Sequence, residues 1–185
     1  MKTFKNRIIA IVALVAIAAS SAVAAAPSEG RLNDEQMNKK VRKELVTLPY
    51  YGVFDNLAYK IEGDTVTLYG QVVRPSTRRD AEYRVARIAG VRRVVNNIEV
   101  LPLSPFDDSI RRQTYRQVFN TAGLYRYAMG VNPSLHIIVN RGHVTLEGVV
   151  ATQADKQFAY VAASSVPGVF SVTNNLRAER GERKY

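Results

Sequence analysis

The sequence predicts an α+β protein built from two tandem αββαβ domains, each a small mixed three-stranded sheet with helices packed on one face. The first observation behind this prediction is an internal repeat. Shifted by 78 positions, residues 52–100 align without a gap to residues 130–178, and 14 of the 49 pairs are identical, where ordinary composition gives roughly three. The second is that stretches of helical and strand periodicity alternate in the same order in both repeats. Such a repeat indicates a duplicated domain.

The first unit contains two helical and three strand segments. Residues 33–48 begin with an Asn33 or Asp34 cap and carry apolar residues at helical spacing. Residues 57–61 and 65–73 alternate with period two around "EGD" and predict a hairpin. Residues 76–89 predict a second helix, with Ser76 or Thr77 as its cap, and residues 91–100 a third strand. The buried stripe expected on the second helix is Ala81, Val85, Ile88 and Ala89.

The second unit repeats this order, with a helix near residues 108–122, strands at 135–139 and 144–151, a helix near 154–165 and a strand near 169–176. The strand–helix–strand part predicts parallel pairing beside an antiparallel hairpin. Both helices are then expected on one face of the sheet. The expected domains are 31–101 and 108–178, with a proline-bearing linker at 102–107 and a charged tail at 179–185.

The first 24 residues have the organisation of a secretory signal peptide: a basic start, an apolar run at residues 8–19 and small residues before the cleavage point. Cleavage is expected after Ala24, with Ala26 as the second choice. The apolar run is shorter than the about 20 residues of a membrane-spanning helix. The chain has no cysteine, so disulfides, thiol catalysis and a lipidated cysteine are excluded. We therefore expect a soluble periplasmic protein that is exported and is not a lipoprotein.

Both units carry the pattern VxLxGxV followed by GVxxVxN, which resembles the signature of the BON domain family. The matching residues are Val66, Leu68, Gly70, Val72, Gly90, Val91, Val94 and Asn96, then Val144, Leu146, Gly148, Val150, Gly168, Val169, Val172 and Asn174. The resemblance implies an αββαβ fold and a non-enzymatic periplasmic protein linked to envelope integrity or osmotic stress, attached to phospholipid membranes. Some two-domain members are lipoproteins, so the absence of cysteine here implies peripheral membrane contact.

The repeated glycines and asparagines are interpreted as structural: Gly70, Gly90, Asn96, Gly148, Gly168 and Asn174. Gly90 directly follows a helical segment, where a left-handed residue commonly ends the helix. Asn96 shares a strand face with Val94 and Ile98, so it is expected at or near the core. A buried amide has to be hydrogen-bonded, because leaving it unpaired costs about 1–3 kcal/mol.

The sequence offers no catalytic constellation, and we expect neither enzyme activity nor a cofactor. His136 and His143 are expected to point away from the apolar face, as ordinary surface residues. A metal site needs three or four converging ligands, and none can be assembled around them. Asp107 and Asp108 precede a helical segment and are interpreted as a helix-cap signal.

The charge distribution separates the two units. The formal net charge of +10 falls to about +7 once the three basic residues of the signal peptide are removed, which favours anionic partners. Residues 71–93 hold seven arginines against two acids, whereas the matching residues 149–171 are neutral. Guanidinium groups bind phosphates through paired hydrogen bonds. The candidate lipid- or anion-binding residues are Arg78, Arg79, Tyr83, Arg84, Arg87, Arg92 and Arg93, then Arg111, Arg112 and Arg116 in the next helix.

Several interpretations of these residues stay open. The plain alternative is a solvated helix face, with Asp80 and Arg84 as a helical ion pair. The first functional hypothesis is a peripheral envelope module that binds anionic phospholipid. The second is a protein-interaction or chaperone-like adaptor for envelope proteins. Binding of nucleic acid or acidic glycan shares the electrostatics, but export makes nucleic acid an unexpected partner.

Overall fold

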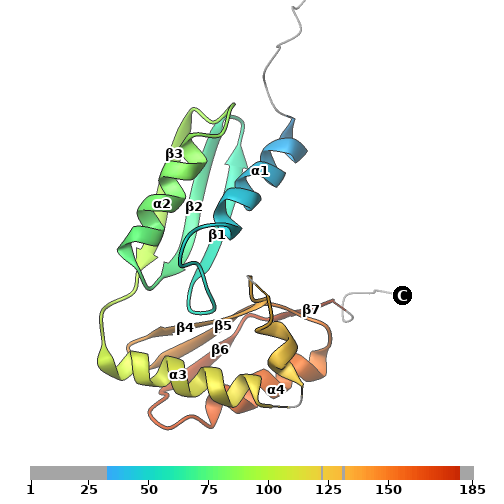
Figure 1. The fold of residues 1–185 in the computed structure, drawn as a ribbon. Coiled ribbons are helices and arrows are strands. Elements are labelled where there is room, and N and C mark those ends of the chain that lie inside the picture. The colour runs from blue at the N-terminus through green and yellow to red at the C-terminus, as the bar shows by residue number, and fades with distance from the viewer. Residues whose placement is uncertain (1–32, 122, 131, 180–185) are drawn as a thin grey trace, which may run out of the picture.

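A computed structural model describes residues 33–121, 123–130 and 132–179. The expected signal peptide and all but the first residue of the expected charged tail lie outside these ranges. The first domain contains α1 (Asp34–Val46), β1 (Asn56–Glu62), β2 (Thr65–Val72), α2 (Pro75–Ala86) and β3 (Arg93–Val100). The second contains α3 (Pro105–Phe119), the 3₁₀ helix η1 (Leu124–Tyr127), β4 (Leu135–Asn140), β5 (His143–Val150), α4 (Gln153–Ser164), β6 (Ser171–Asn174) and β7 (Arg177–Ala178). The predicted order of helices and strands is confirmed (Figure 1).

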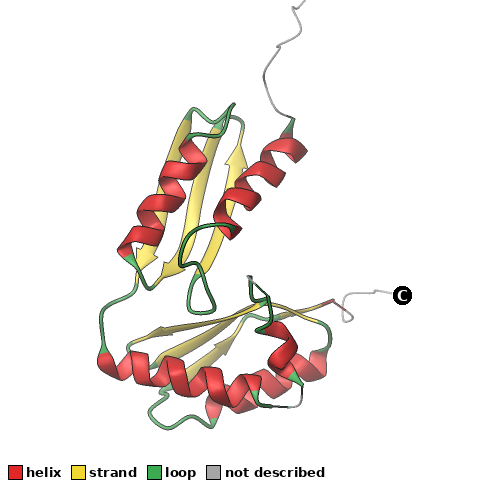
Figure 2. Ribbon diagram, viewed as in Figure 1, coloured by secondary structure: helices red, strands yellow, loops and turns green. Residues whose placement is uncertain are grey.

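Each domain is a mixed sheet with its two helices on one face (Figure 2). In the first sheet β2 is the central strand, antiparallel to β1 and parallel to β3. In the second sheet β5 has the same place between β4 and β6. The last strand of this sheet breaks after Asn174, and its second part, β7, also pairs with β5, so four strands are present where three were expected.

Two helices begin earlier than the sequence predicts. The α3 helix starts at Pro105, inside the expected linker, because the Ser104 side chain caps it by accepting from the Asp107 amide at 3.1 Å. The α2 helix starts at Pro75, and neither Ser76 nor Thr77 is its cap. Proline suits the first turn of a helix, because the amide it lacks has no partner there.

The two cores repeat each other. In the first domain the buried residues are Met37, Val41 and Leu45 of α1, Val66, Leu68 and Val72 of β2, and Ala81, Val85 and Ile88 around α2. Ala89, expected in this stripe, is exposed. In the second domain Ile110 and Val118 of α3 pack against Leu146 and the inner face of β4. Full burial of one such aliphatic side chain stabilises the fold by about 1.5–3 kcal/mol.

Two of the repeated glycines lie where a side chain has no room, and the other two follow a helix with a positive φ. Gly70 and Gly148 have φ angles of +117° and +119°, and a Cβ there would lie 2.0 Å from the Asn56 carbonyl oxygen and 2.1 Å from that of Ser134. Gly90 has the expected positive φ of 95° after α2, and Gly168 one of 87° after α4. These residues let the backbone turn and let neighbouring strands approach.

The repeated asparagines share two hydrogen bonds in both domains, and Asn96 Nδ2 also donates to Glu82 Oε2 at 2.9 Å. Asn96 Nδ2 donates to the Arg78 carbonyl at 3.1 Å, and its Oδ1 accepts from the Ile98 amide at 3.2 Å. Asn174 Nδ2 donates to the Lys156 carbonyl at 2.9 Å, and its Oδ1 accepts from the Leu176 amide at 3.2 Å. Each asparagine thus ties the last strand to the preceding helix, which supports the structural interpretation.

Replacing either asparagine by alanine is expected to destabilise the protein. Asn96→Ala and Asn174→Ala each leave a strand amide and a helix carbonyl without their side-chain partner. Both asparagines are half-buried, so the cost is that of ordinary hydrogen bonds, about 0.5–1.5 kcal/mol each. Urea unfolding followed by circular dichroism measures this cost. The exposed neighbour Asn97 provides the control, since Asn97→Ala should change stability by no more than about 0.5 kcal/mol. An Asn96→Ala protein as stable as the wild type would contradict the structural interpretation.

The segment after α1 packs on the second domain. The Ile137 amide donates to the Val53 carbonyl at 2.7 Å, and the His136 Nδ1 lies 3.2 Å from the Gly52 carbonyl oxygen. Phe54 contacts Tyr115 of α3 with ring centroids 6.1 Å apart. His136 is therefore only 8% exposed, and its expected place on the free surface is wrong, because this segment of the first domain covers it. His143 is exposed, as expected.

This contact predicts a loss of stability below neutral pH. Burial lowers the pKa of His136 below its usual 6.5, against the hydrogen bond to Gly52 and the charge of Asp55. The unfolded chain then binds a proton more readily than the folded chain. The contribution of His136 to the free energy of unfolding is therefore complete above pH 6.5 and falls as the pH drops. The slope cannot exceed about 1.4 kcal/mol per pH unit for one proton.

Urea unfolding at pH 7.5 and 5.5 tests this, with His136→Gln as the comparison. The variant isolates the histidine from Asp55, whose buried carboxyl has a raised pKa because of its burial, against hydrogen bonds from the Val73 and Gly52 amides. A raised pKa acts in the opposite sense, since its contribution is lost as pH rises. If His136→Gln retains the full pH dependence of the wild type, His136 is not its source.

Candidate anion-binding site

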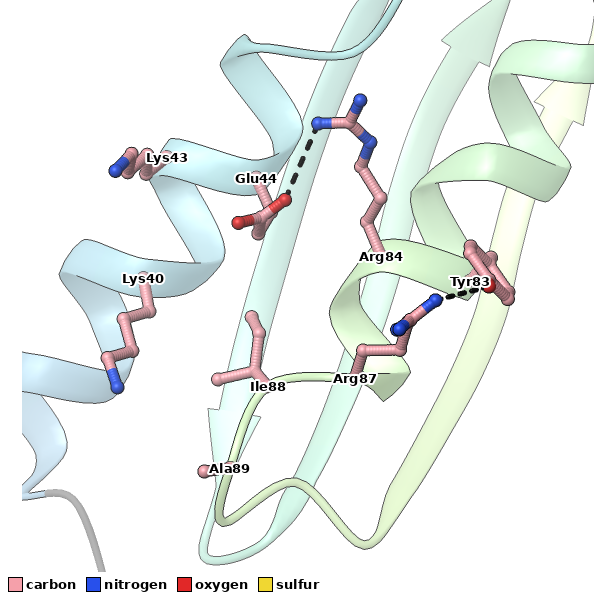
Figure 3. Close-up of a pocket in the computed structure, with 8 residues that line it drawn as sticks. All are labelled: Lys40, Lys43, Glu44, Tyr83, Arg84, Arg87, Ile88 and Ala89. Atoms are coloured by element: carbon pink, nitrogen blue, oxygen red, sulfur yellow. Dashed lines mark hydrogen bonds and ion pairs between the residues drawn. The ribbon is translucent and has the colours of Figure 1, made fainter.

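The two helices of the first domain lie side by side and leave a groove of about 530 Å³ between them (Figure 3). Its α1 wall is formed by Lys40, Lys43 and Glu44, and its α2 side by Tyr83, Arg84, Arg87, Ile88 and Ala89.

Packing of the helices on the sheet determines which side chains reach the groove. Val41 and Leu45 face the core, so their neighbours Lys40 and Glu44 fall on the side of α1 that faces α2. On α2, Val85 is fully buried and its neighbour Arg84 lies at the rim. The basic side chains are thus presented by a rigid scaffold.

The contacts inside the groove are few. Arg84 Nη1 lies 3.5 Å from Glu44 Oε2, with both side chains 35% exposed, and 3.4 Å from Thr47 Oγ1. Arg87 stacks over Tyr83 with its guanidinium carbon 5.1 Å from the ring centroid, and also donates to the Tyr83 hydroxyl. Arg84 therefore pairs with Glu44 on the neighbouring helix. The alternative interpretation, in which Arg84 pairs with Asp80 on its own helix, is wrong.

The groove has an excess of positive charge. Lys40, Lys43, Arg84 and Arg87 line the groove together with a single carboxylate, that of Glu44. Within residues 33–121, 123–130 and 132–179, no ion pair is formed by either lysine or by Arg87. Unneutralised cations around a concave surface attract anions, and guanidinium groups favour phosphate or carboxylate.

The sequence-predicted residues divide between this site and other places. Tyr83, Arg84 and Arg87 line the groove, whereas Arg78 and Arg79 are exposed nearer the start of α2. Arg92 and Arg93 are exposed outside the groove, and Arg92 lies 3.5 Å from Asp64. Sequence reasoning missed Lys40, Lys43 and Glu44, although their positions beside the buried stripe of α1 were a usable signal.

Arg111 is not a surface anion-binding residue. It is only 3% exposed, its Nη2 donates to the Val139 carbonyl at 2.7 Å, and its Nη1 pairs with Asp108. Asp107, expected to be part of a cap signal, is likewise buried and accepts from the Arg141 and Gly142 amides at 2.9 and 2.8 Å. Asp107 therefore holds the turn between β4 and β5, and Arg111 ties α3 to β4.

The remaining α3 candidates, Arg112 and Arg116, are exposed. Together with Phe54 and Tyr115 they line a second, smaller hollow of about 290 Å³. Two cations on an apolar hollow form a weaker anion site than four cations around one groove.

Over residues 33–121, 123–130 and 132–179, no three His, Asp or Glu side chains are grouped so that they could hold a metal ion. In the same part of the chain, no helix has the length and apolarity of a membrane span.

Comparison with known proteins identifies one family, and structures of CdsD are among the similar solved structures. The model of the BON domain family matches residues 33–102 and again residues 107–180. A structure of the C-terminal domain of CdsD, the structural protein of the type III secretion system of Chlamydia trachomatis, is 9% identical with a TM-score of 0.31, covering 80% of this chain and 99% of that one. A second CdsD structure is 10% identical with a TM-score of 0.30, covering 78% and 94%. No curated protein matches.

Proposed function

This chain belongs to the BON domain family, with two domains in tandem, and on that basis we propose that it is a non-enzymatic envelope-maintenance or stress protein of the periplasm that binds anionic phospholipid surfaces peripherally through basic residues. Proteins with BON domains are typically periplasmic or associated with the envelope. To this the proposal adds anionic phospholipid as the partner, and it assigns the membrane contact to the first domain.

The groove between α1 and α2 is the observation that carries this proposal. It holds four cations and a single carboxylate, and Arg78 and Arg79 are exposed nearer the start of α2. A lysine or arginine near an anionic membrane contributes about 1 kcal/mol, and this attraction fades within a Debye length. Four to six such residues are enough for reversible binding that depends on salt.

The second candidate function is a protein-interaction or chaperone-like adaptor, and exposed apolar side chains of the second domain favour it. Phe158 and Val161 of α4 are 45% and 55% exposed. Phe106 and Phe170 are 49% and 70% exposed, with their rings 6.1 Å apart, and Leu103 of the preceding linker is 92% exposed. Uncharged apolar surface of this kind is typical of protein interfaces.

Co-sedimentation with vesicles separates the two functions. The wild-type protein is expected to pellet with vesicles of phosphatidylglycerol and phosphatidylcholine, not with phosphatidylcholine alone, and to be released as salt is raised from 50 to 300 mM. Failure to pellet with either vesicle would exclude the lipid proposal and leave the adaptor. Competition by acidic glycan or nucleic acid that is stronger than competition by lipid would assign the basic surface to those polymers.

A further inference from the structure

We propose that the groove between α1 and α2 is a discrete binding site for one headgroup phosphate of an anionic lipid. In this proposal Glu44 competes with the phosphate for Arg84, and the phosphate displaces it. This inference rests on the proposed function and adds to it a single site, its ligand group and the residue that limits its affinity.

The groove has the build of a ligand site. Its volume of about 530 Å³ falls within the range of about 300–1,000 Å³ that small-molecule sites occupy. Ile88, which is 8% exposed, and Ala89 give it an apolar surface below the charged rim. Charge interactions strengthen where apolar walls exclude water. A phosphate in this groove would meet cations from both helices at once.

The contact between Arg84 and Glu44 is a weak one that a phosphate can replace. Its separation of 3.5 Å exceeds the about 2.7–2.9 Å of a strong charge-assisted hydrogen bond. The other contact of this guanidinium, to Thr47 Oγ1, is 3.4 Å long. Figure 3 shows Arg84 extending from α2 toward Glu44 on α1. Arg84 therefore retains hydrogen-bonding capacity that the paired oxygens of a phosphate can satisfy.

Arg87 makes a different contact from Arg84. Figure 3 shows it turned toward Tyr83 on its own helix, where it stacks at 5.1 Å and donates to the hydroxyl. The tyrosine leaves the positive charge of Arg87 intact, because it brings no carboxylate. Among the residues that the structure describes, Arg84 is the groove arginine that contacts a carboxylate, that of Glu44.

The second domain lacks the matching residues. At the repeat offset of 78, Arg84 corresponds to the buried Ala162 and Arg87 to Ser165. From this difference we expect one phosphate-binding site per chain, in the first domain.

The test compares Glu44→Gln with the matched control Glu35→Gln. Both remove one negative charge from α1, but Glu35 pairs with Lys39 and does not line the groove. The probes are phosphatidylglycerol vesicles, dihexanoyl-phosphatidylglycerol below its micelle concentration, and inorganic phosphate. Circular dichroism first establishes that both variants are folded.

Glu44→Gln is expected to bind the vesicles and the short-chain lipid about two- to fivefold more tightly than the wild type, the range that an exposed ion pair spans. Glu35→Gln should leave short-chain lipid binding unchanged, and the lipid should saturate at one molecule per chain. Equal effects of the two variants, or vesicle binding without saturable short-chain lipid binding, would overturn the discrete site and leave the proposed function standing. Inorganic phosphate binding as tightly as the short-chain lipid would overturn the lipid source. If the wild-type protein binds no vesicles, both the discrete site and the proposed function are overturned.

Discussion

Gly70→Ala is expected to unfold the first domain, and Gly148→Ala the second. An alanine Cβ at Gly70 would lie 2.0 Å from the Asn56 carbonyl oxygen, and at Gly148 2.1 Å from that of Ser134. The obstacle in each case is the backbone of the neighbouring strand, which cannot rotate away as a side chain can. Overpacking costs about 1–3 kcal/mol, and a residue with a Cβ held at these φ angles costs about 1–3 kcal/mol more. The two costs together are about 2–6 kcal/mol, which at the upper end exceeds the stability of a marginally stable domain, since domain stabilities are about 5–15 kcal/mol.

Urea unfolding followed by circular dichroism measures this loss, and other glycines of the chain provide the controls. At Gly130, φ is +92° and an added Cβ meets nothing within 4 Å, so Gly130→Ala carries the backbone strain without the collision. At Gly52 the space is open and no positive φ is involved. We expect the order of stability to be Gly52→Ala, then Gly130→Ala, then the two strand variants. Strand variants as stable as Gly52→Ala would show that the close approach of β1 to β2, and of β4 to β5, is not required.

Replacing Lys40, Lys43, Arg84 and Arg87 together by glutamine is expected to abolish binding to anionic vesicles. At about 1 kcal/mol for each basic residue near the membrane, the loss is on the order of 4 kcal/mol, or about a thousandfold in affinity. Circular dichroism should stay unchanged, because three of the four side chains are exposed and Arg84 is half-buried. A vesicle titration at low salt measures the loss. A variant that keeps most of its affinity would move the contact out of the groove.

The fold follows from local signals that each repeat contains in full. Alternating residues in β2 and β5, and glycines after α2 and α4, agree in both copies. Agreement among such signals is what makes a fold predictable. The early start of α3 was also legible, since Ser104 and Pro105 form a cap and a first helical residue.

The site was harder to predict, because it depends on contacts between elements. The charge on α2 was evident, but Lys40 and Lys43 join it only through the packing of α1 beside α2. Arg111 looks like any exposed arginine in the sequence. It is buried, and its two terminal nitrogens donate to Asp108, three residues away in the chain, and to the Val139 carbonyl, 28 residues away. His136 is covered by a segment of the other domain, which periodicity within one strand cannot reveal.

The most direct test of the central claim compares two double variants by co-sedimentation with phosphatidylglycerol vesicles. Arg84→Gln/Arg87→Gln removes two charges from the groove of the first domain, and Arg112→Gln/Arg116→Gln removes two from α3 of the second. Both leave the same net charge, so general attraction to the vesicle is matched. We predict that the groove variant stays in the supernatant while the α3 variant pellets like the wild type. The reverse result, or equal loss in both, would contradict membrane binding through the groove of the first domain.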